Sequence, residues 1–383
     1  MDEKIIQKFV SAADCRECVE QVLDHDHFRF EEISKFNTRW WAIYSARNDG
    51  KSVTVDIDCA LSDFFTSGRQ LLYLRRRRRE AKASKVEAYF TNDRIFAFLQ
   101  KICPLAFPFF DIYRLEAKTG KINLYGVTNN VKTLLATVGF YSALDSYEED
   151  KSNAAGAQVY SVIYEEFLAP SSDGKELDDE FERLLNAITT YTRDKDFRVY
   201  CIGNTVRRRS KVFEGFGVNP DEIPLGIAKT YKYRTKNGDE NTLCVYHIPE
   251  TKSRKRTVKS YFFGDKNRTN LIGDEWYTAD FPPIPEEYGS DLFKPRLSLR
   301  IIDGQITLYL YFTPDGKIIC AVSRWCSFCN YITISEKTDL KKGWISKEGA
   351  LNLINTIRKF VEHGFVFYEN NYAGDDLLTF LEK

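Results

Sequence analysis

Apolar and polar positions in the first 217 residues follow two different periods. Short runs rich in β-branched and aromatic residues are typical of strands, whereas apolar residues three or four positions apart are typical of helices. Because such strands alternate with such helices, the pattern predicts an α/β domain with a mostly parallel sheet. The predicted strands are 39–44, 70–75, 110–116, 121–125, 134–139, 159–164 and 198–203, and the predicted helices are 15–24, 52–66, 84–100 and 177–191.

The pattern changes after residue 217. The following stretch is charged and rich in turn residues; Asn237-Gly238 predicts a hairpin turn, and the prolines of 281–285 indicate a linker. We predict an α/β domain at 1–217, a linker or lid at 218–295 and a small α+β domain at 296–383. In the last part we expect strands at 297–302, 306–311 and 317–322, a helix at 347–362 and a short terminal helix.

The segment between the first predicted strand and the helix after it carries the most informative motif. Gly50-Lys51-Ser52 matches the last three residues of a phosphate-binding P-loop. Backbone N–H groups in such a loop bind phosphate oxygens, and the helix N-terminus adds its positive dipole end. We predict that Lys51 contacts the β- and γ-phosphates and that the Ser52 hydroxyl binds Mg²⁺. The predicted nucleotide-binding set is Ser45, Ala46, Arg47, Asn48, Asp49, Gly50, Lys51 and Ser52.

This loop departs from the full pattern. Ser45 stands where the pattern has glycine, and Asn48 occupies a turn position where asparagine tolerates a positive φ. Asp49 places an acid beside the phosphate site, which is unfavourable unless its side chain points away. The alternative interpretation is an ordinary turn between a strand and a helix.

A second motif follows roughly a hundred residues later. Residues 159–167 form an apolar strand that ends in two adjacent carboxylates, which is a Walker B pattern. We predict that Glu165 helps to hold Mg²⁺ beside Ser52, and that Glu166 orients and deprotonates the attacking water. Aspartate is commoner than glutamate at position 165, and the alternative is an edge strand with two solvated acids. Together the two motifs favour a nucleoside triphosphatase.

Length and composition fit an enzyme of two domains. The chain has 383 residues and is 43% hydrophobic, which is enough for two cores. Its apolar runs are far shorter than the ~20 residues of a membrane span, and the first residues, Met1–Lys4, do not resemble a signal peptide. We therefore expect no membrane partner and a cytoplasmic location.

Nine cysteines include two C-x-x-C pairs, Cys15/Cys18 and Cys326/Cys329. A zinc site would require all four to meet across most of the chain. Reduced, partly buried thiols are the favoured interpretation.

The formal net charge is zero, yet basic residues are clustered. Three basic runs in a neutral chain favour a polyanionic partner over a set of solvated surfaces. The first run begins where the strand at 70–75 ends, which in a parallel sheet is the ligand-binding edge. The predicted nucleic-acid contacts are Arg75, Arg76, Arg77, Arg78, Arg207, Arg208, Arg209, Lys211, Lys252, Arg254, Lys255 and Arg256.

Four segments, 44–52, 72–76, 163–167 and 201–205, resemble in order and spacing the DNA-packaging ATPases of phi-29-like tailed phages, compact relatives of the terminase large subunits. The resemblance is clearest over residues 36–217. It implies a P-loop ATPase domain that uses ATP and Mg²⁺, and a homo-oligomeric ring, typically a pentamer. The implied partners are double-stranded DNA, the phage portal (connector) and the prohead, with a structural packaging RNA as a further candidate.

The resemblance also implies roles for individual residues. Arg47 matches a γ-phosphate-sensing arginine, and Asn204 with Thr205 matches a polar sensor and coupling position. Arg193 matches an arginine finger supplied to the neighbouring subunit, and Lys151 is a second trans-acting candidate. The alternative for Arg193 and Lys151 is an ordinary surface ion pair.

The C-terminal part of this family resembles an RNase H-type nuclease that has lost its catalysis. Asp303 and Asp315 fall in predicted turns, and the sequence offers no convincing acidic cluster for two metals. The resemblance therefore implies docking rather than nuclease activity, and a protein that acts transiently at the prohead portal vertex in the host cytoplasm and is absent from the mature virion. Rival interpretations are a helicase-like translocase, a nucleoside kinase or GTPase switch, and a non-enzymatic nucleic-acid-binding protein.

Overall fold

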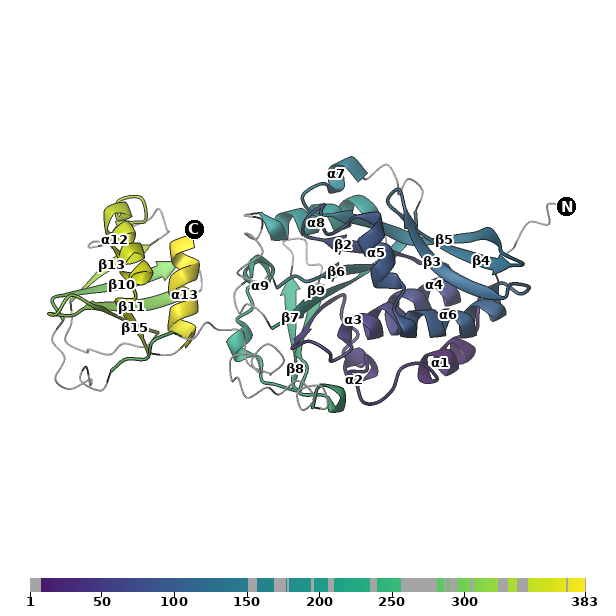
Figure 1. Ribbon diagram of the computed structural model, residues 1–383, viewed down its shortest axis with the longest axis horizontal. Coiled ribbons are helices and arrows are strands. Elements are labelled where there is room, and N and C mark those ends of the chain that lie inside the picture. The colour runs from purple at the N-terminus through teal and green to yellow at the C-terminus, as the bar shows by residue number, and fades with distance from the viewer. Residues whose placement is uncertain are drawn as a thin grey trace. The chain divides into compact units, whose positions relative to one another are not determined.

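The computed structural model describes residues 8–150, 157–168, 177, 179–193, 196–205, 210–234, 240–255, 281–285, 288, 295–303, 306–322, 330–335, 344–369 and 371–382. The chain divides into two compact units, Met1–Trp276 and Tyr277–Lys383. Figure 1 shows the helices and strands of both.

The first unit is built on a nine-stranded sheet with the strand order β3-β4-β5-β2-β6-β7-β1-β9-β8. The six central strands, β5-β2-β6-β7-β1-β9, are parallel to one another. Antiparallel strands extend the sheet at both edges, β4 and β3 beside β5 and β8 beside β9. The strands are β1 (Trp40–Ser45), β2 (Gln70–Arg75), β3 (Ile112–Lys118), β4 (Lys121–Thr128), β5 (Val131–Ala143), β6 (Val159–Glu165), β7 (Arg198–Asn204), β8 (Ala228–Arg234) and β9 (Glu240–His247).

Alternate residues of the parallel strands pack into two hydrophobic cores. On β1, Trp41 and Ile43 belong to the first core, and Ala42 and Tyr44 belong to the second. Helices α1 (Ala12–Glu20), α4 (Ser62–Ser67), α5 (Ala83–Phe90) and α6 (Asp93–Ala106) contribute to the first core, and α8 (Glu180–Thr192) and α9 (Lys211–Phe216) to the second (Figure 1). Helices thus cover both faces of the sheet, which explains the nearly continuous apolar character of its strands.

The sequence predicted the α/β class and the strand order along the chain, and both are confirmed. The helix predicted at 52–66 consists of three consecutive segments: α3 (Lys51–Thr54), the π-helical η1 (Val55–Leu61) and α4. Short helices α2 (Glu31–Ser34) and α7 (Tyr147–Asp150) and the 3₁₀ turn η3 (Pro220–Glu222) also belong to this unit.

The single helix predicted at 84–100 is wrong, because the structure has two helices there, α5 and α6. Asn92 separates them: its side-chain oxygen accepts a hydrogen bond from the Arg94 N–H and caps α6. Asparagine is a preferred residue for this role because it satisfies a donor that the helix leaves unpaired.

The boundary predicted at residue 217 also differs from the structure. Strands β8 and β9 lie within the stretch predicted to be a linker or lid, yet β9 pairs parallel with β1 and belongs to the first sheet. Their apolar residues complete the core, with Leu243 and Val245 in the second core. The predicted hairpin is supported by the antiparallel pairing of β8 with β9, although Asn237 and Gly238 lie outside the described residues.

The second unit is a six-stranded mixed sheet with the order β14-β13-β10-β11-β12-β15. Strands β10 (Leu297–Asp303), β11 (Ile306–Phe312) and β12 (Ile318–Ala321) are antiparallel neighbours, and β13 (Tyr331–Ser335) and β14 (Trp344–Ser346) continue in parallel from β10. Strand β15 (Val366–Tyr368) pairs with β12, and helices α12 (Leu351–Glu362) and α13 (Asn371–Glu382) pack on this sheet. The sheet and its two helices make this unit a small α+β domain.

Two further expectations concern the chain as a whole. Within the described residues, the helices all fall short of the length and apolar character needed to cross a membrane. Cys15 and Cys18 are buried free thiols on α1, and burial raises the pKa of both. Cys326 and Cys329, the second pair, lie outside the described residues.

Candidate active site

The P-loop connects the carboxyl end of β1 with the first turn of α3. Gly50 precedes α3 with a φ of 79°, and Asn48 has a φ of 70°. This backbone region suits glycine and is tolerated by asparagine. A Cβ on Gly50 would also lie 2.9 Å from the Cβ of His27. Both the conformation and the close neighbour therefore explain why glycine stands at this position.

Lys51 is buried at the centre of the loop. Its Nζ donates hydrogen bonds to the carbonyl oxygen of Ala46 at 3.0 Å and to Oδ1 of Asn204 at 2.8 Å. Burial lowers the pKa of Lys51 to about 8, although Asp49 and Glu165 act in the opposite direction. The ammonium therefore lies where phosphates would bind, held by two neutral oxygens.

Ser52 and Glu165 meet although 113 residues separate them in the chain. The Ser52 hydroxyl donates to Oε1 of Glu165 at 2.7 Å. Glu165 is the last residue of β6, and burial raises its pKa. The predicted pairing of P-loop and Walker B residues is thus present in the geometry.

Glu166 follows β6 and has a φ of 59°, a left-handed conformation uncommon for a residue that is not glycine. Its carboxylate forms an ion pair with Arg75, the last residue of the neighbouring strand β2. Arg75 was predicted to contact nucleic acid, but its position assigns it to the candidate active site. An unusual backbone conformation at such a place is typical of functional residues.

Arg76 does not face solvent, so its assignment as a nucleic-acid contact is wrong. Its guanidinium is buried, binds both carboxylate oxygens of Glu180 and also donates to the carbonyl oxygens of Glu166 and Phe167. Tyr164 donates a further hydrogen bond to Glu180. Arg76 therefore anchors the segment after β6 to the start of α8.

Arg254 was predicted to contact nucleic acid as well, and that is also wrong. Its Nη1 lies 2.9 Å from Oδ2 of Asp49, and both side chains are fully buried. Thr251 donates a second hydrogen bond to Asp49 at 2.7 Å. The acid of the P-loop is therefore turned toward the segment after β9, and its charge is paired there.

The other predicted residues fall into three groups. Asn204 and Thr205 lie at the end of β7, and Thr205 N–H donates to the carbonyl oxygen of Ser45. Arg47 is exposed within the P-loop, and Arg193 is exposed at the C-terminal cap of α8. Lys151, Arg207, Arg208, Arg209 and Arg256 lie outside the described residues.

The remaining predicted nucleic-acid contacts differ in their exposure and in their ion pairs. Arg78 is exposed and pairs with Glu149, and Lys211 pairs with Glu214. Arg77 is half-buried, and Lys252 and Lys255 are exposed.

Sequence reasoning missed two residues that complete the site. Tyr89 of α5 directs its hydroxyl to Oε2 of Glu165 at 3.3 Å. Asp56, four residues after Ser52, is fully buried, and its pKa is raised by burial and by the nearby charge of Glu165. Neither belongs to a local motif, because their place near Glu165 depends on how the helices pack on the sheet.

The arrangement gathers a cation, a hydroxyl and two carboxylates at one edge of a parallel sheet. The Ser52 hydroxyl beside the Glu165 carboxylate fits Mg²⁺, which in nucleotide sites takes few protein ligands together with phosphate oxygens. Glu166 lies beyond this pair with its carboxylate accessible to solvent. This set can bind a triphosphate and supply a base to a water molecule.

Comparison with solved structures finds chains of similar fold. The chain is similar to a chain of the bacteriophage Phi-29 viral genome packaging motor assembly, with 16% identity and a TM-score of 0.55 over 93% of this chain and 98% of that one. Lower TM-scores, 0.46 and 0.42, are found for the Phi-28 gp11 DNA packaging motor and for the N-terminal domain of the DNA packaging ATPase from bacteriophage phi29, at 16% and 19% identity. The match to the Phi-28 motor covers 94% of this chain and 97% of the Phi-28 chain. The match to the phi29 N-terminal domain covers 58% of this chain and 96% of that domain's chain. No family model and no curated protein matches the sequence. At this identity the first likeness establishes a shared fold over nearly the whole chain.

Proposed function

We propose that this protein is the ATPase of a viral genome packaging motor, which hydrolyses ATP to translocate double-stranded DNA. The contact between Ser52 and Glu165 carries the proposal, because it joins the P-loop to the Walker B strand as an NTPase requires. The shared fold with the Phi-29 packaging motor chain supports the choice of a packaging motor over other NTPases.

The P-loop residues bind the triphosphate. The backbone N–H groups of residues 45–52 and the start of α3 face the phosphates. Lys51 leaves Asn204 and contacts the β- and γ-phosphates, since a charged partner is a stronger acceptor than an amide oxygen. Asp49 remains paired with Arg254, so its negative charge does not oppose the phosphates.

Ser52 and Glu165 are the residues that would hold Mg²⁺, Glu165 directly or through water. When bound, the ion supplies neutralisation of the charge on the β- and γ-phosphates. Tyr89 orients the Glu165 carboxylate through its hydrogen bond.

Glu166 is the general base. A water oxygen attacks the γ-phosphorus, its proton passes to the Glu166 carboxylate, and the bond from the γ-phosphorus to the bridging oxygen breaks, which yields ADP and phosphate. In the structure Glu166 is paired with Arg75. Hydrolysis therefore requires the carboxylate to exchange this partner for the attacking water.

Arginines stabilise the charge of the transition state. Arg47, exposed within the P-loop, acts on its own subunit's γ-phosphate. Arg193, exposed at the end of α8, acts on the site of the neighbouring subunit in a homo-oligomeric ring, with Lys151 as a second trans-acting residue. Such arginines are worth about 10³–10⁵ in turnover.

Loss of the γ-phosphate frees Lys51 to return to Asn204 at the end of β7. The change of Lys51 from a phosphate partner to Asn204 couples the nucleotide state to the end of β7. Thr205, whose N–H donates to the carbonyl oxygen of Ser45, takes part in this coupling. Exposed basic residues, among them Lys252 and Lys255, contact the DNA backbone. Phosphate contacts of this kind do not depend on base sequence, which suits a protein that moves any DNA.

The second unit serves as a docking domain for the portal, the prohead or a structural RNA, and it lacks nuclease activity. Asp303, the acid at the end of β10, is buried. The chain thus acts at the portal vertex of the prohead while DNA enters.

The proposal is tested by packaging into proheads of the same phage. Purified chain, proheads and double-stranded DNA are mixed with ATP, and DNA protected from DNase is measured. Wild type and Lys101→Ala, a control lysine on α6 whose Nζ donates to Gln21, should protect DNA. Lys51→Ala should not. Protection that persists without ATP or in Lys51→Ala would overturn the proposal, as would unwinding of the duplex instead of its uptake.

A further inference from the structure

A loop between α6 and β3 presents a phenyl ring to solvent. Phe109 is 90% exposed, and its φ is 89°, a conformation that bulky residues rarely adopt. Exposing so large an apolar side chain in a strained backbone is unfavourable for an isolated chain. Such a residue calls for a partner that covers it.

Neighbouring residues hold this loop in place. The Tyr113 hydroxyl donates a hydrogen bond to the carbonyl oxygen of the buried Phe107. The Phe110 ring packs on Gly126, and a Cβ added to Gly126 would lie 2.4 Å from that ring. The Thr128 hydroxyl donates to the carbonyl oxygen of Phe109 itself. Phe109 is therefore a pre-formed projection, and we call it the Phe109 knob.

Further apolar side chains are exposed on the same strands. Ile112 lies on β3, and Val131 and Leu134 lie on β5; all three are exposed. Strands β3, β4 and β5 form one edge of the nine-stranded sheet. The strands that follow the knob along the chain thus carry further exposed apolar side chains.

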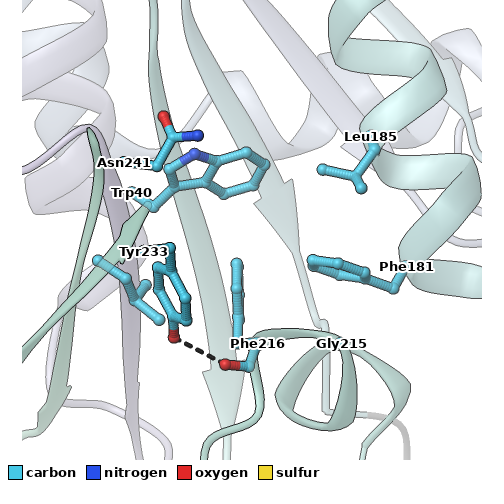
Figure 2. Close-up of a pocket in the computed structure, with 8 residues that line it drawn as sticks. Trp40, Phe181, Leu185, Gly215, Phe216, Tyr233 and Asn241 are labelled. Carbon is cyan, nitrogen blue, oxygen red and sulfur yellow. Dashed lines mark hydrogen bonds between the residues drawn. The ribbon is translucent and has the colours of Figure 1, made fainter. Parts of the chain in front are cut away.

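The opposite edge of the same sheet carries an apolar pocket (Figure 2). It has a volume of about 150 Å³ and lies between strands β1, β8 and β9 and helices α8 and α9, and we call it the Trp40 pocket. Its lining residues are Trp40, Phe181, Leu185, Gly215, Phe216, Tyr233, Asn241 and Leu243.

The walls of the pocket are fixed by aromatic contacts. The Phe216 ring packs edge-on against both Trp40 and Phe181, with centroid distances of 5.5 and 5.0 Å. The Tyr233 hydroxyl donates to the carbonyl oxygen of Phe216 (Figure 2). Gly215 allows Phe181 to approach, since a Cβ there would lie 2.1 Å from its ring. A rigid aromatic pocket suits a flat apolar side chain.

We propose that the Phe109 knob of one copy of this chain inserts into the Trp40 pocket of the next copy. Cavities of about 150 Å³ lined by apolar side chains accept a benzene ring, which matches the size of the pocket and the shape of the knob. Because knob and pocket lie at opposite edges of one sheet, the contact is heterologous, head to tail. Contacts of this type form closed rings when the rotation between copies closes.

This inference deepens the ring assembly of the proposed function and rests on it only for the existence of a ring. Its test measures assembly rather than ATP turnover. The proposed contact between copies and the proposed ATPase function can therefore fail separately. Asp111→Cys, at an exposed position two residues from the knob that leaves the Phe109 ring in place, is prepared as one full-length chain. Leu185→Cys, at the partly exposed rim of the pocket, is prepared as another. A short bismaleimide cross-linker is added to each chain alone and to their mixture.

Cross-linked dimers should appear in the mixture and remain at the wild-type background in each variant alone. The seven cysteines among the described residues are buried. Cys326 and Cys329, which lie outside those residues, are replaced by serine in every chain, the wild-type background included. Dimers formed by Asp111→Cys alone would indicate a symmetric contact and overturn the proposal. A chain that assembles without the mixed cross-link, or that stays monomeric at its highest soluble concentration with and without ATP, would overturn it too.

A second measurement quantifies the contact by sedimentation. Phe109→Ala should weaken self-association by about 10- to 30-fold, the effect of a central aromatic residue at an interface. Phe96→Ala is the matched control, because Phe96 is also an exposed phenylalanine but lies on α6. Equal effects of the two substitutions would contradict the assignment of the knob.

Discussion

At the scale of single residues, the polar groups of the site bind one another. Lys51 is held by Asn204, Ser52 by Glu165, and Glu166 by Arg75. Each pair joins a residue that would bind phosphate, metal or water to a partner on a neighbouring strand or loop. Nucleotide binding therefore exchanges partners that already exist, and this exchange gives the site measurable properties.

The first property is a dependence of ATP binding on pH. The pKa of Lys51 in the free protein is about 8, and bound phosphates raise it because they stabilise the ammonium. Binding then takes up a proton, so affinity falls as pH rises through the free pKa. At pH 9 we expect affinity to be about tenfold lower than at pH 7.5. Titration calorimetry in buffers of different ionisation enthalpy measures both effects.

Lys51→Arg provides the control, because guanidinium stays charged throughout this range. Its affinity should vary little with pH. An identical pH profile in wild type and Lys51→Arg would show that another group titrates.

Gly50 allows a residue-scale prediction about the loop itself. Gly50→Ala combines a positive φ with a Cβ 2.9 Å from His27, whereas Gly217→Ala has a φ of 64° and no neighbour within 4 Å. The positive φ alone costs about 1–2 kcal/mol. Gly50→Ala should therefore lower the free energy of unfolding, measured in urea, by more than Gly217→Ala does. Equal losses would mean that His27 moves aside freely.

At the scale of elements, the P-loop is connected to more than the strand and helix that flank it. Asp49 forms a buried ion pair with Arg254 in the segment after β9, and this segment also contacts Asp49 through Thr251. The π-helical η1 follows α3 directly and brings Asp56 near Glu165. Insertions of this kind are frequent at functional sites.

The ion pair predicts a large effect of Arg254→Met on stability. Removal of one partner leaves the Asp49 carboxylate buried without its charge partner, which costs about 3–5 kcal/mol. Urea unfolding followed by tryptophan fluorescence should report this loss. The double variant Asp49→Asn with Arg254→Met should recover part of it. A loss below about 1 kcal/mol for the single variant, the range of exposed ion pairs, would contradict the burial of the pair.

Local patterns in the sequence predicted the elements far better than the contacts between them. The β1–P-loop–α3 unit and the acids at the end of β6 follow from periodicity and motif spacing, and the structure has both. Arg76 and Arg254 look like members of basic runs, but burial against Glu180 and Asp49 decides their role. Tyr89 reaches Glu165 from a helix whose packing no local pattern encodes.

The same limit explains the misplaced boundary at residue 217. Strand β9 pairs with β1 across about 200 residues of sequence, and its charged, turn-rich surroundings suggested a linker. Pairing partners of such separation are determined by the whole sheet. The local signal for strands in this stretch was the hairpin turn predicted at Asn237-Gly238.

At the scale of the whole molecule, the proposed trans action of Arg193 makes a prediction about mixtures. Glu166→Ala lacks the base and Arg193→Ala lacks the finger, so each should be inactive alone as an ATPase. In a mixed ring, an Arg193→Ala subunit whose neighbour is Glu166→Ala has its own Glu166 and receives the neighbour's Arg193. Phosphate release should therefore be partly restored on mixing. Absence of any restoration in rings shown by sedimentation to be mixed would contradict a finger in trans.

The central claim is that the sheet edge formed by β1, β6 and β7 is an ATP hydrolysis site, and that this hydrolysis drives the translocation of double-stranded DNA. Its most direct measurement is ATP turnover of the full chain, with and without double-stranded DNA, for wild type and Lys51→Ala. We predict turnover that DNA stimulates, and a loss of about 10²–10³-fold in Lys51→Ala, comparable to the removal of one preorganised group that stabilises transition-state charge. Wild type that neither binds nor hydrolyses ATP would contradict the account, as would Lys51→Ala with undiminished turnover.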